Sequence, residues 1–503
     1  MDEVLLGAGP IGPRDLWAIA EGRAVRLSTE GLARMAAGRA VIAEAEAAGA
    51  AVYGVTTGLG PRVTERLSAK DRQRFAAATL RGRAHALGPA LAPGVVRAAM
   101  AIRIQGFLTG AVGVRPGLAE FLAACLNARL TPVLGETGSI GAADLLWGGS
   151  FGAALIGEGE MDTPEGRQPA DTALRAAGLA PWQPASREGL ALASHSSVTA
   201  ALAALGLARL SALMASAEIS AALVMEGFRA NPSPLDSDVL ALSPKPGQDR
   251  AAEGLRRLLH GSHLHAAEGP RRLQDPLSIR NIVQVHGAVF AALAFLEDAV
   301  AGEVNGLTDN PVVLTARGAV RPGGSYLSPH LAIAATAAAT ACCHLAAQQV
   351  ARMGKLLAER FSGLPSGLTH IGAGGAGLGA LLKAPEALFA EIHQCAQPAP
   401  IYPSLSADGL EDTVTHAAIP AKALHGICDR LERIVAIEMI VAAQAIELRG
   451  VEIAPRLRPA LGDLRALSPR VEADRALTRE IEAVAHAIAE GRFTRTDSPG
   501  ESP

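Results

Sequence analysis

The stretch from Pro132 to Glu160 reads PVLGETGSIGAADLLWGGSFGAALIGEGE. Its first part is a glycine-rich loop, and its second part is an apolar segment that ends in Ile-Gly-Glu-Gly-Glu. Closely spaced glycines favour a loop, whereas the apolar run favours a helix. Loops held by a rigid scaffold often carry functional groups, so this stretch is the first candidate for a site.

Long helices are predicted for the second half of the chain. Apolar residues recur with helical spacing over four long runs, which are residues 199–227, 278–303, 331–359 and 421–448. Before them, shorter helical patterns at 71–86 and 92–108 alternate with glycine-rich loops. The pattern predicts a mainly α protein with a central bundle of long helices and a loop-rich N-terminal part.

The predicted organisation is one continuous unit over residues 1–490, because no proline- or serine-rich linker divides it. Its loop-rich active-site part covers about 1–200, and its bundle covers about 200–490. Residues 491–503 are polar and rich in turn formers, and we predict a disordered tail there.

The composition predicts a soluble globular protein. Hydrophobic residues make up 49% of the chain and charged residues 19%, and a net charge of -3 gives no overall attraction to nucleic acid or to an anionic membrane. The uncharged run at 331–351 is rich in alanine and favours a buried bundle helix over a membrane span. The N-terminus has no basic region before an apolar run, so we expect a cytoplasmic protein. No histidine or carboxylate cluster has the spacing of metal ligands.

The 132–160 stretch resembles the signature of histidine and phenylalanine ammonia-lyases, in which a Gly-Ser-Val/Ile-Gly-Ala-Ser-Gly-Asp-Leu loop precedes a similar helix. Other segments are similar to the same aromatic amino acid ammonia-lyase family and follow in the same order: Tyr53–Gly60, Arg83–Ala86, Glu188–Leu192 (a strand-like entry in the resemblance), Gln274–Arg280, Gln284–Gly287, Thr308–Pro311, Gly323–Tyr326 and Glu411–Asp412. The resemblance implies an ammonia-lyase fold and a C–N lyase activity on an amino acid. It also implies a homotetramer, because the family builds each site from several chains.

Two residues in these segments match the chemistry of amine elimination. A guanidinium holds a carboxylate through two parallel charge-assisted hydrogen bonds, which suits Arg280 to the role of carboxylate clamp. The loop tyrosine of the family is its catalytic base, and Tyr53 occupies that place. A tyrosine of pKa ~10 serves as a base only where its surroundings favour the phenolate. For each residue the alternative is structural: a surface charge for Arg280 and a turn residue for Tyr53.

The resemblance assigns the remaining pocket residues. His85 and Glu411 match positions that line the side-chain pocket in histidine-specific relatives, so they favour a histidine-like substrate over phenylalanine. Gln274 and Tyr326 are expected as walls of the substrate site. A lone histidine is more often a packing residue, and an acid such as Glu411 is also common at the start of a helix.

The resemblance breaks at the prosthetic group. The family cyclises an internal Ala-Ser-Gly into a methylidene-imidazolone (MIO), an electrophile that needs the serine hydroxyl and an unhindered glycine nitrogen. This chain reads Gly141-Ala142-Ala143-Asp144, one residue short and without the serine. MIO should therefore not form, and we predict no cofactor.

Positions near the missing electrophile differ as well. Ser194 stands where the family has an asparagine that contacts MIO, and we expect Ser194 to contact the substrate. His195 replaces a glycine, and Leu277 replaces a tyrosine. His195 could act as an acid or base, or it could fill vacated space.

Two functions follow from these changes. The first is a C–N lyase that eliminates ammonia or another amine from an α-amino acid without MIO, because its substrate has a better leaving group or a more acidic proton. The second is a catalytically silent homologue that binds an amino acid or assembles with an active relative. The retained tyrosine, histidine and arginine favour the enzyme.

Overall fold

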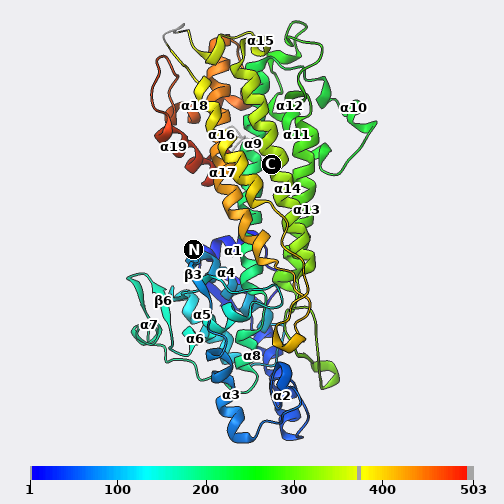
Figure 1. Cartoon of the computed structure of the whole chain (residues 1–503), viewed down its shortest axis with the longest axis vertical. Helices are drawn as coiled ribbons and strands as arrows, with labels where there is room; N and C mark the ends of the chain where they lie inside the picture. The colour runs from blue at the N-terminus through cyan, green and yellow to red at the C-terminus, as the bar shows by residue number, and fades with distance from the viewer. Residues whose placement is uncertain (1–2, 371–374, 495–503) are drawn as a thin grey trace. The chain divides into compact units, whose positions relative to one another are not determined.

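The computed structural model describes residues 3–370 and 375–494, and these form two compact units (Figure 1). Unit 1 comprises Met1–Ala208, Glu297–Ala335 and Pro398–Lys422, and unit 2 comprises Arg209–Leu296, Thr336–Gln397 and Ala423–Pro503. Four long helices have residues in both: α9 (Ser197–Phe228), α13 (Ile282–Asn305), α14 (Pro329–Leu357) and α17 (Ala418–Arg449). With 60% of its residues helical, the protein confirms the prediction of a mainly α fold.

Unit 1 combines short helices with small sheets. Its helices before α9 are α1 (Pro13–Ala20), α2 (Thr29–Ala47), α3 (Ala69–Arg81), α4 (Pro93–Phe107), α5 (Pro116–Asn127), α6 (Leu145–Leu155), α7 (Ala170–Ala176) and α8 (Glu188–Ala193). Its strands are β1 (Val4–Leu6), β2 (Val25–Leu27), β3 (Leu87–Ala90), β4 (Thr131–Pro132), β5 (Gly135–Thr137), β6 (Glu160–Thr163), β7 (Gly166–Pro169), β8 (Val312–Leu314) and β9 (Ala319–Arg321). They pair as β1–β2 (parallel) and as β3–β5, β4–β6–β7 and β8–β9 (antiparallel).

Helix α4 forms the core of unit 1, because every residue from Val95 to Phe107 is buried. Its neighbours α1 and α5 pack against it. Two arginines lie on this buried helix, and each has polar partners. Arg97 donates to the carbonyls of Ile19 and Leu126 at 2.9 and 3.1 Å. Arg103 binds the buried carboxylate of Asp309.

Glycines allow α3, α6 and α8 to pack closely. A Cβ on Gly148 of α6 would lie 2.3 Å from the Ala193 carbonyl oxygen of α8, and one on Gly189 of α8 would lie 2.2 Å from the Ala76 oxygen of α3. The segment 188–192 lies within α8 and is helical, so the expected strand-like entry was wrong. The Glu188 carboxylate accepts the Ala185 backbone N–H at 2.8 Å, which stabilises the start of α8.

Unit 2 is a helical bundle. Besides its parts of the long helices it contains α10 (Ser237–Ala241), α11 (Gln248–Leu258), α12 (Leu277–Arg280), α15 (Glu359–Ser362), α16 (Lys383–Cys395), α18 (Arg458–Leu467) and α19 (Thr478–Ala489). A fully buried ion pair lies inside it, in which Arg352 of α14 donates to both Glu438 oxygens of α17 at 2.6 and 2.9 Å. Ser220 of α9 donates to the same carboxylate at 2.8 Å, so three helices share one polar contact.

The predicted boundaries need three corrections. The first is that the helix predicted for 71–86 ends at Arg81, where Gly82 follows as its C-cap. The second is that the predicted division near residue 200 falls at 208, and unit 1 also takes residues 297–335 and 398–422 from the expected bundle. The third concerns the tail predicted for 491–503. It begins too early because Phe493 is buried in a short turn of helix, Arg492–Thr494, and residues 495–503 lie outside the described part.

Candidate functional site

The predicted site residues fall into two groups. Unit 1 contains Tyr53, His85, Ser194, His195, Tyr326, Glu411 and the altered loop Gly141–Asp144, whereas unit 2 contains Gln274 and Arg280.

The altered loop is held by its own backbone. The Ala143 N–H donates to the Tyr326 carbonyl at 3.0 Å, and the Asp144 N–H donates to the His195 carbonyl at 2.8 Å. Ala143 has a left-handed φ of 56°, which is uncommon for a residue with a side chain. Four of the predicted site residues therefore meet here through main-chain contacts.

The residues of this loop do not fit the family's prosthetic group. Its side chains contain no hydroxyl, and the flanking serines in the sequence, Ser139 and Ser150, lie outside the position of the family's serine and accept backbone hydrogen bonds. Ser139 accepts the Gly141 N–H at 3.0 Å, and Ser150 accepts the Ala86 N–H at 3.3 Å. Ser194, at the end of α8, is half-buried.

Asp144 links the loop to helix α9. Its fully buried carboxylate accepts the Thr199 backbone N–H at 2.9 Å and the Thr199 hydroxyl at 2.7 Å. Burial raises the pKa of Asp144, and these hydrogen bonds partly oppose the rise. Asp144 therefore fixes the start of α9 as well as the end of the loop.

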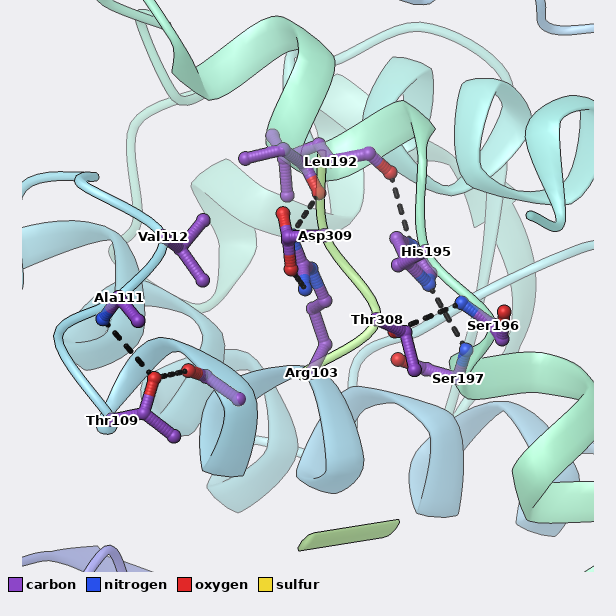
Figure 2. A network of polar contacts seen from close by, with 12 residues as sticks. Arg103, Thr109, Ala111, Val112, Leu192, His195, Ser196, Ser197, Thr308 and Asp309 are labelled. Carbon is purple, nitrogen blue, oxygen red and sulfur yellow. Dashed lines mark hydrogen bonds and ion pairs between the residues drawn. The ribbon is translucent and has the colours of Figure 1, made fainter. Parts of the chain in front are cut away.

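His195 is locked by the backbone around it (Figure 2). Its Nδ1 accepts the Ser197 N–H at 3.2 Å, so Nε2 carries the proton and donates to the Leu192 carbonyl at 3.1 Å. Burial, with the nearby Arg103 guanidinium, lowers the pKa of His195 to about 3. The ring is therefore neutral and has both nitrogens occupied, which supports the packing role over the acid–base role.

A buried ion triad of Arg103, Arg187 and Asp309 lies beside this turn, and Figure 2 shows its Arg103–Asp309 pair. Arg103 donates to both Asp309 oxygens at 2.6 and 2.8 Å, and Arg187 donates to one of them at 3.1 Å. Burial by itself would raise the pKa of Asp309, but the two guanidiniums hold it below its ordinary value. Thr308 accepts the Ser196 N–H at 3.3 Å. The Thr308–Pro311 motif is therefore a support for the 192–197 turn.

The Tyr53 loop packs on a small apolar core that contains Val52 and Val55. The Tyr53 hydroxyl is half-buried with its ring and accepts the Gly60 N–H at 3.1 Å. The short 3-10 turn that follows, Gly60–Arg62, contacts the turn Ala407–Gly409 just before Glu411. The loops of Tyr53 and Glu411 are thus neighbours in unit 1.

His85 lies on an exposed turn after α3, and this turn is clamped to α6. A Cβ on Gly149 of α6 would lie 2.3 Å from the Arg83 carbonyl, so the two backbones touch. Glu411 is half-buried, and burial raises the pKa of its carboxyl while the Arg83 guanidinium partly lowers it. Arg83 therefore connects the His85 turn to Glu411 electrostatically.

Gln274 and Arg280 line one cavity of about 460 Å³ in unit 2. Lys245 and several carboxamide side chains also line it, including Asn281 and Gln284. Burial raises the pKa of the neighbouring Asp275, and the surrounding arginines, Arg280 among them, lower it in part. The predicted clamp thus lies in a polar cavity of a size suited to a small molecule.

Two polar residues near the altered loop were not foreseen. Glu303 of α13 is half-buried, and burial raises the pKa of its carboxyl to about 7, with the Ser328 hydroxyl lowering it in part and Asp144 raising it further. His416 donates its backbone N–H to the Ile140 carbonyl at 3.0 Å. Neither belonged to a pattern with chemical meaning, so only the tertiary structure identifies them.

Three helical segments are long and apolar enough to cross a membrane by length and composition: Glu188–Phe228, Ile282–Asn305 and Pro329–Leu357. In their most apolar windows 72%, 44% and 50% of residues are buried within the protein. Among residues 3–370 and 375–494, no group of three His, Cys, Asp or Glu side chains could hold a metal ion.

Comparison with known proteins agrees with this architecture. The chain is 34% identical over 495 residues to the histidine ammonia-lyase of Symbiobacterium thermophilum, covering 98% of each chain. The solved histidine ammonia-lyase of Trypanosoma cruzi has a TM-score of 0.91 at 27% identity and covers 98% of this chain and 95% of its own. The ergothioneine-degrading ergothionase of Treponema denticola has a TM-score of 0.92 at 26% identity and covers 98% of this chain and 99% of its own.

Fold and relatives together define a helical C–N lyase of the ammonia-lyase type, a class that acts on amino acids. The sequence profile of the aromatic amino acid lyases matches residues 11–466. The chain belongs to the aromatic amino acid lyase family.

Proposed function

We propose that this protein eliminates a tertiary amine from a histidine-type betaine, an amino acid whose α-nitrogen carries three alkyl groups, and that it does so without MIO. The observation that carries the proposal is the altered loop. Gly141–Asp144 contains no serine, and its backbone is tied to Tyr326 and His195.

The chemistry of the leaving group supports a betaine. A base that faces a primary α-ammonium removes its N–H proton before the much less acidic proton on Cβ. A quaternary nitrogen has no N–H, so only the Cβ proton can be taken. The C–H electron pair then forms the Cα–Cβ double bond, and the Cα–N pair leaves with the neutral amine. The ergothioneine-degrading relative is consistent with such a substrate, because ergothioneine is a histidine betaine.

In this proposal Tyr53 takes the Cβ proton as its phenolate, and Arg280 binds the carboxylate. His85 and Glu411 line the pocket for the imidazole side chain, and Gln274, Tyr326 and Ser194 form its walls. Because the family builds each site from several chains, we further propose that a homotetramer assembles the complete site. Exposed small side chains along α14, such as Thr340, Ala347 and Ala351, suit close helix packing between chains. We expect the protein in the cytoplasm.

Two measurements test this proposal. The intact mass should equal that calculated from the sequence, whereas MIO formation would remove water. Incubation with histidine betaine or ergothioneine should release trimethylamine and an unsaturated acid that absorbs in the near ultraviolet, while histidine should give no product. Turnover of histidine together with a mass deficit would overturn the proposal.

The silent homologue remains the second candidate, and the locked ring of His195 is the observation in its favour. Saturable betaine binding without product, in a preparation of confirmed mass and tetrameric size, would favour it over the enzyme. Light scattering on the eluting peak of a gel-filtration column measures that size.

A further inference from the structure

His416 occupies an unusual position beside the altered loop. It is 9% exposed, and its φ of 46° places it in the left-handed region, where a non-glycine residue is strained. Such strain persists only where surrounding contacts fix the residue, and it concentrates at ligand-binding and catalytic positions.

Several contacts fix His416 against the loop. Its backbone N–H donates to the Ile140 carbonyl at 3.0 Å, and the preceding Thr415 hydroxyl donates to the Gly141 carbonyl at 2.8 Å. The approach is so close that a Cβ on Gly141 would lie 2.2 Å from the Thr415 hydroxyl and 2.4 Å from the His416 nitrogen. His416 therefore cannot move independently of the residues that replace the family's Ala-Ser-Gly.

One ring nitrogen of His416 has no hydrogen-bond partner among the described residues. The His416 ring packs on Tyr402 with centroids 5.3 Å apart, and its Nε2 is buried without a hydrogen-bond partner among the described residues. Leaving a buried polar nitrogen unpaired costs about 1–3 kcal/mol. His195, by contrast, has both nitrogens bonded. Of the two histidines that contact the loop, His416 is thus the one with bonding capacity for a ligand.

We infer that His416 is a substrate-contacting residue, whose Nε2 forms a hydrogen bond to the substrate beside the altered loop. The inference rests on the proposed elimination for the identity of the substrate. The partner is a polar group on a histidine betaine, either a ring nitrogen or the sulfur of a 2-thioimidazole. Tyr53 remains the base, and His416 orients the substrate that Tyr53 deprotonates.

The test compares His416→Met, which keeps an unbranched side chain of similar length without the hydrogen bond, with His416→Gln, whose amide nitrogen can replace Nε2. His486→Met is the matched control, because His486 is exposed on α19 and pairs with Glu490 at the C-terminal end of that helix. We expect His416→Met to lower kcat/KM for the betaine at least 10-fold, His416→Gln to recover part of the loss, and His486→Met to equal wild type. Circular dichroism and melting temperature verify folding of all three.

The outcomes separate this inference from the proposed function. If wild type turns over a betaine and His416→Met matches it, the inference is wrong and the proposed function stands. If wild type gives no product, calorimetric titration with histidine betaine takes the place of kinetics. A Kd raised at least 10-fold in His416→Met and partly restored in His416→Gln supports the contact, whereas an unchanged Kd, or no binding by wild type, overturns it.

Discussion

Replacing Gly141 by alanine should separate the altered loop from the segment that carries His416. Two effects add at this position. A side chain at φ 79° costs about 1–2 kcal/mol because it adopts a left-handed conformation. The new Cβ would also lie 2.2 Å from the Thr415 hydroxyl and 2.4 Å from a backbone nitrogen, and such overpacking costs about 1–3 kcal/mol. We expect a total destabilisation of about 2–5 kcal/mol.

Gly159→Ala is the control for the first effect alone. Gly159 has a φ of 85° and no atom within 4 Å of an added Cβ, so only the backbone cost of about 1–2 kcal/mol applies. Urea unfolding followed by circular dichroism measures both variants, and betaine turnover is recorded alongside. Gly141→Ala should unfold at clearly lower urea and lose turnover even where it is folded. Equal unfolding midpoints for the two variants would refute the close approach of the loop to Thr415.

Three further predictions follow from single side chains. Tyr53→Phe should lower turnover about 10²–10⁴-fold, since it removes the proposed base, while the loss of one hydrogen bond to Gly60 should cost only about 1 kcal/mol; unchanged turnover would refute the assignment. Glu303→Gln should flatten the pH dependence of stability. Burial raises the pKa of Glu303 to about 7 in the folded protein, whereas its pKa in the unfolded chain is about 4.3. The protonated carboxyl therefore makes its full contribution to the free energy of unfolding below about pH 4.3. This contribution, about 3 kcal/mol, is lost as the pH rises to about 7 and above. The melting temperature of Glu303→Gln relative to wild type should therefore rise between pH 5 and pH 8. A constant difference in melting temperature over this range would contradict the burial of a neutral Glu303 carboxyl. Asp309→Asn should destabilise unit 1 by about 3–5 kcal/mol, because two buried guanidiniums lose their counter-charge; a change below about 1 kcal/mol in urea unfolding would refute the triad's structural role.

Helical periodicity predicted the long helices because it depends only on residues close in sequence. The expected runs 199–227 and 421–448 lie within α9 and α17, each extended by a few residues. The apolar run around Leu145–Leu155 is helix α6, as its composition indicated. Its paired glycines, however, face α8 and the Arg83 turn, and no local pattern gives those partners.

The site was harder to predict because its contacts join distant parts of the chain. Thr415 and Gly141, which form one hydrogen bond, are 274 residues apart. A single histidine in a sequence such as Val-Thr-His-Ala has no pattern that distinguishes a ligand-facing ring from a surface one. The resemblance identified the Thr308–Pro311 motif, but only the structure showed that its aspartate holds two buried arginines.

The missing Ala-Ser-Gly triplet and the two histidines at the loop lead to one requirement for the proposed reaction. His195 has both nitrogens bonded to the backbone, and the loop side chains contain no group that could activate an amine. The proposed elimination therefore relies on a substrate that brings a good leaving group. In this proposal the protein contributes positioning, through a carboxylate clamp, a base, and a hydrogen bond from His416 that orients the substrate. In the proposed reaction a quaternary α-nitrogen suits such a site, because it leaves as a neutral tertiary amine and has no N–H proton that could consume the base.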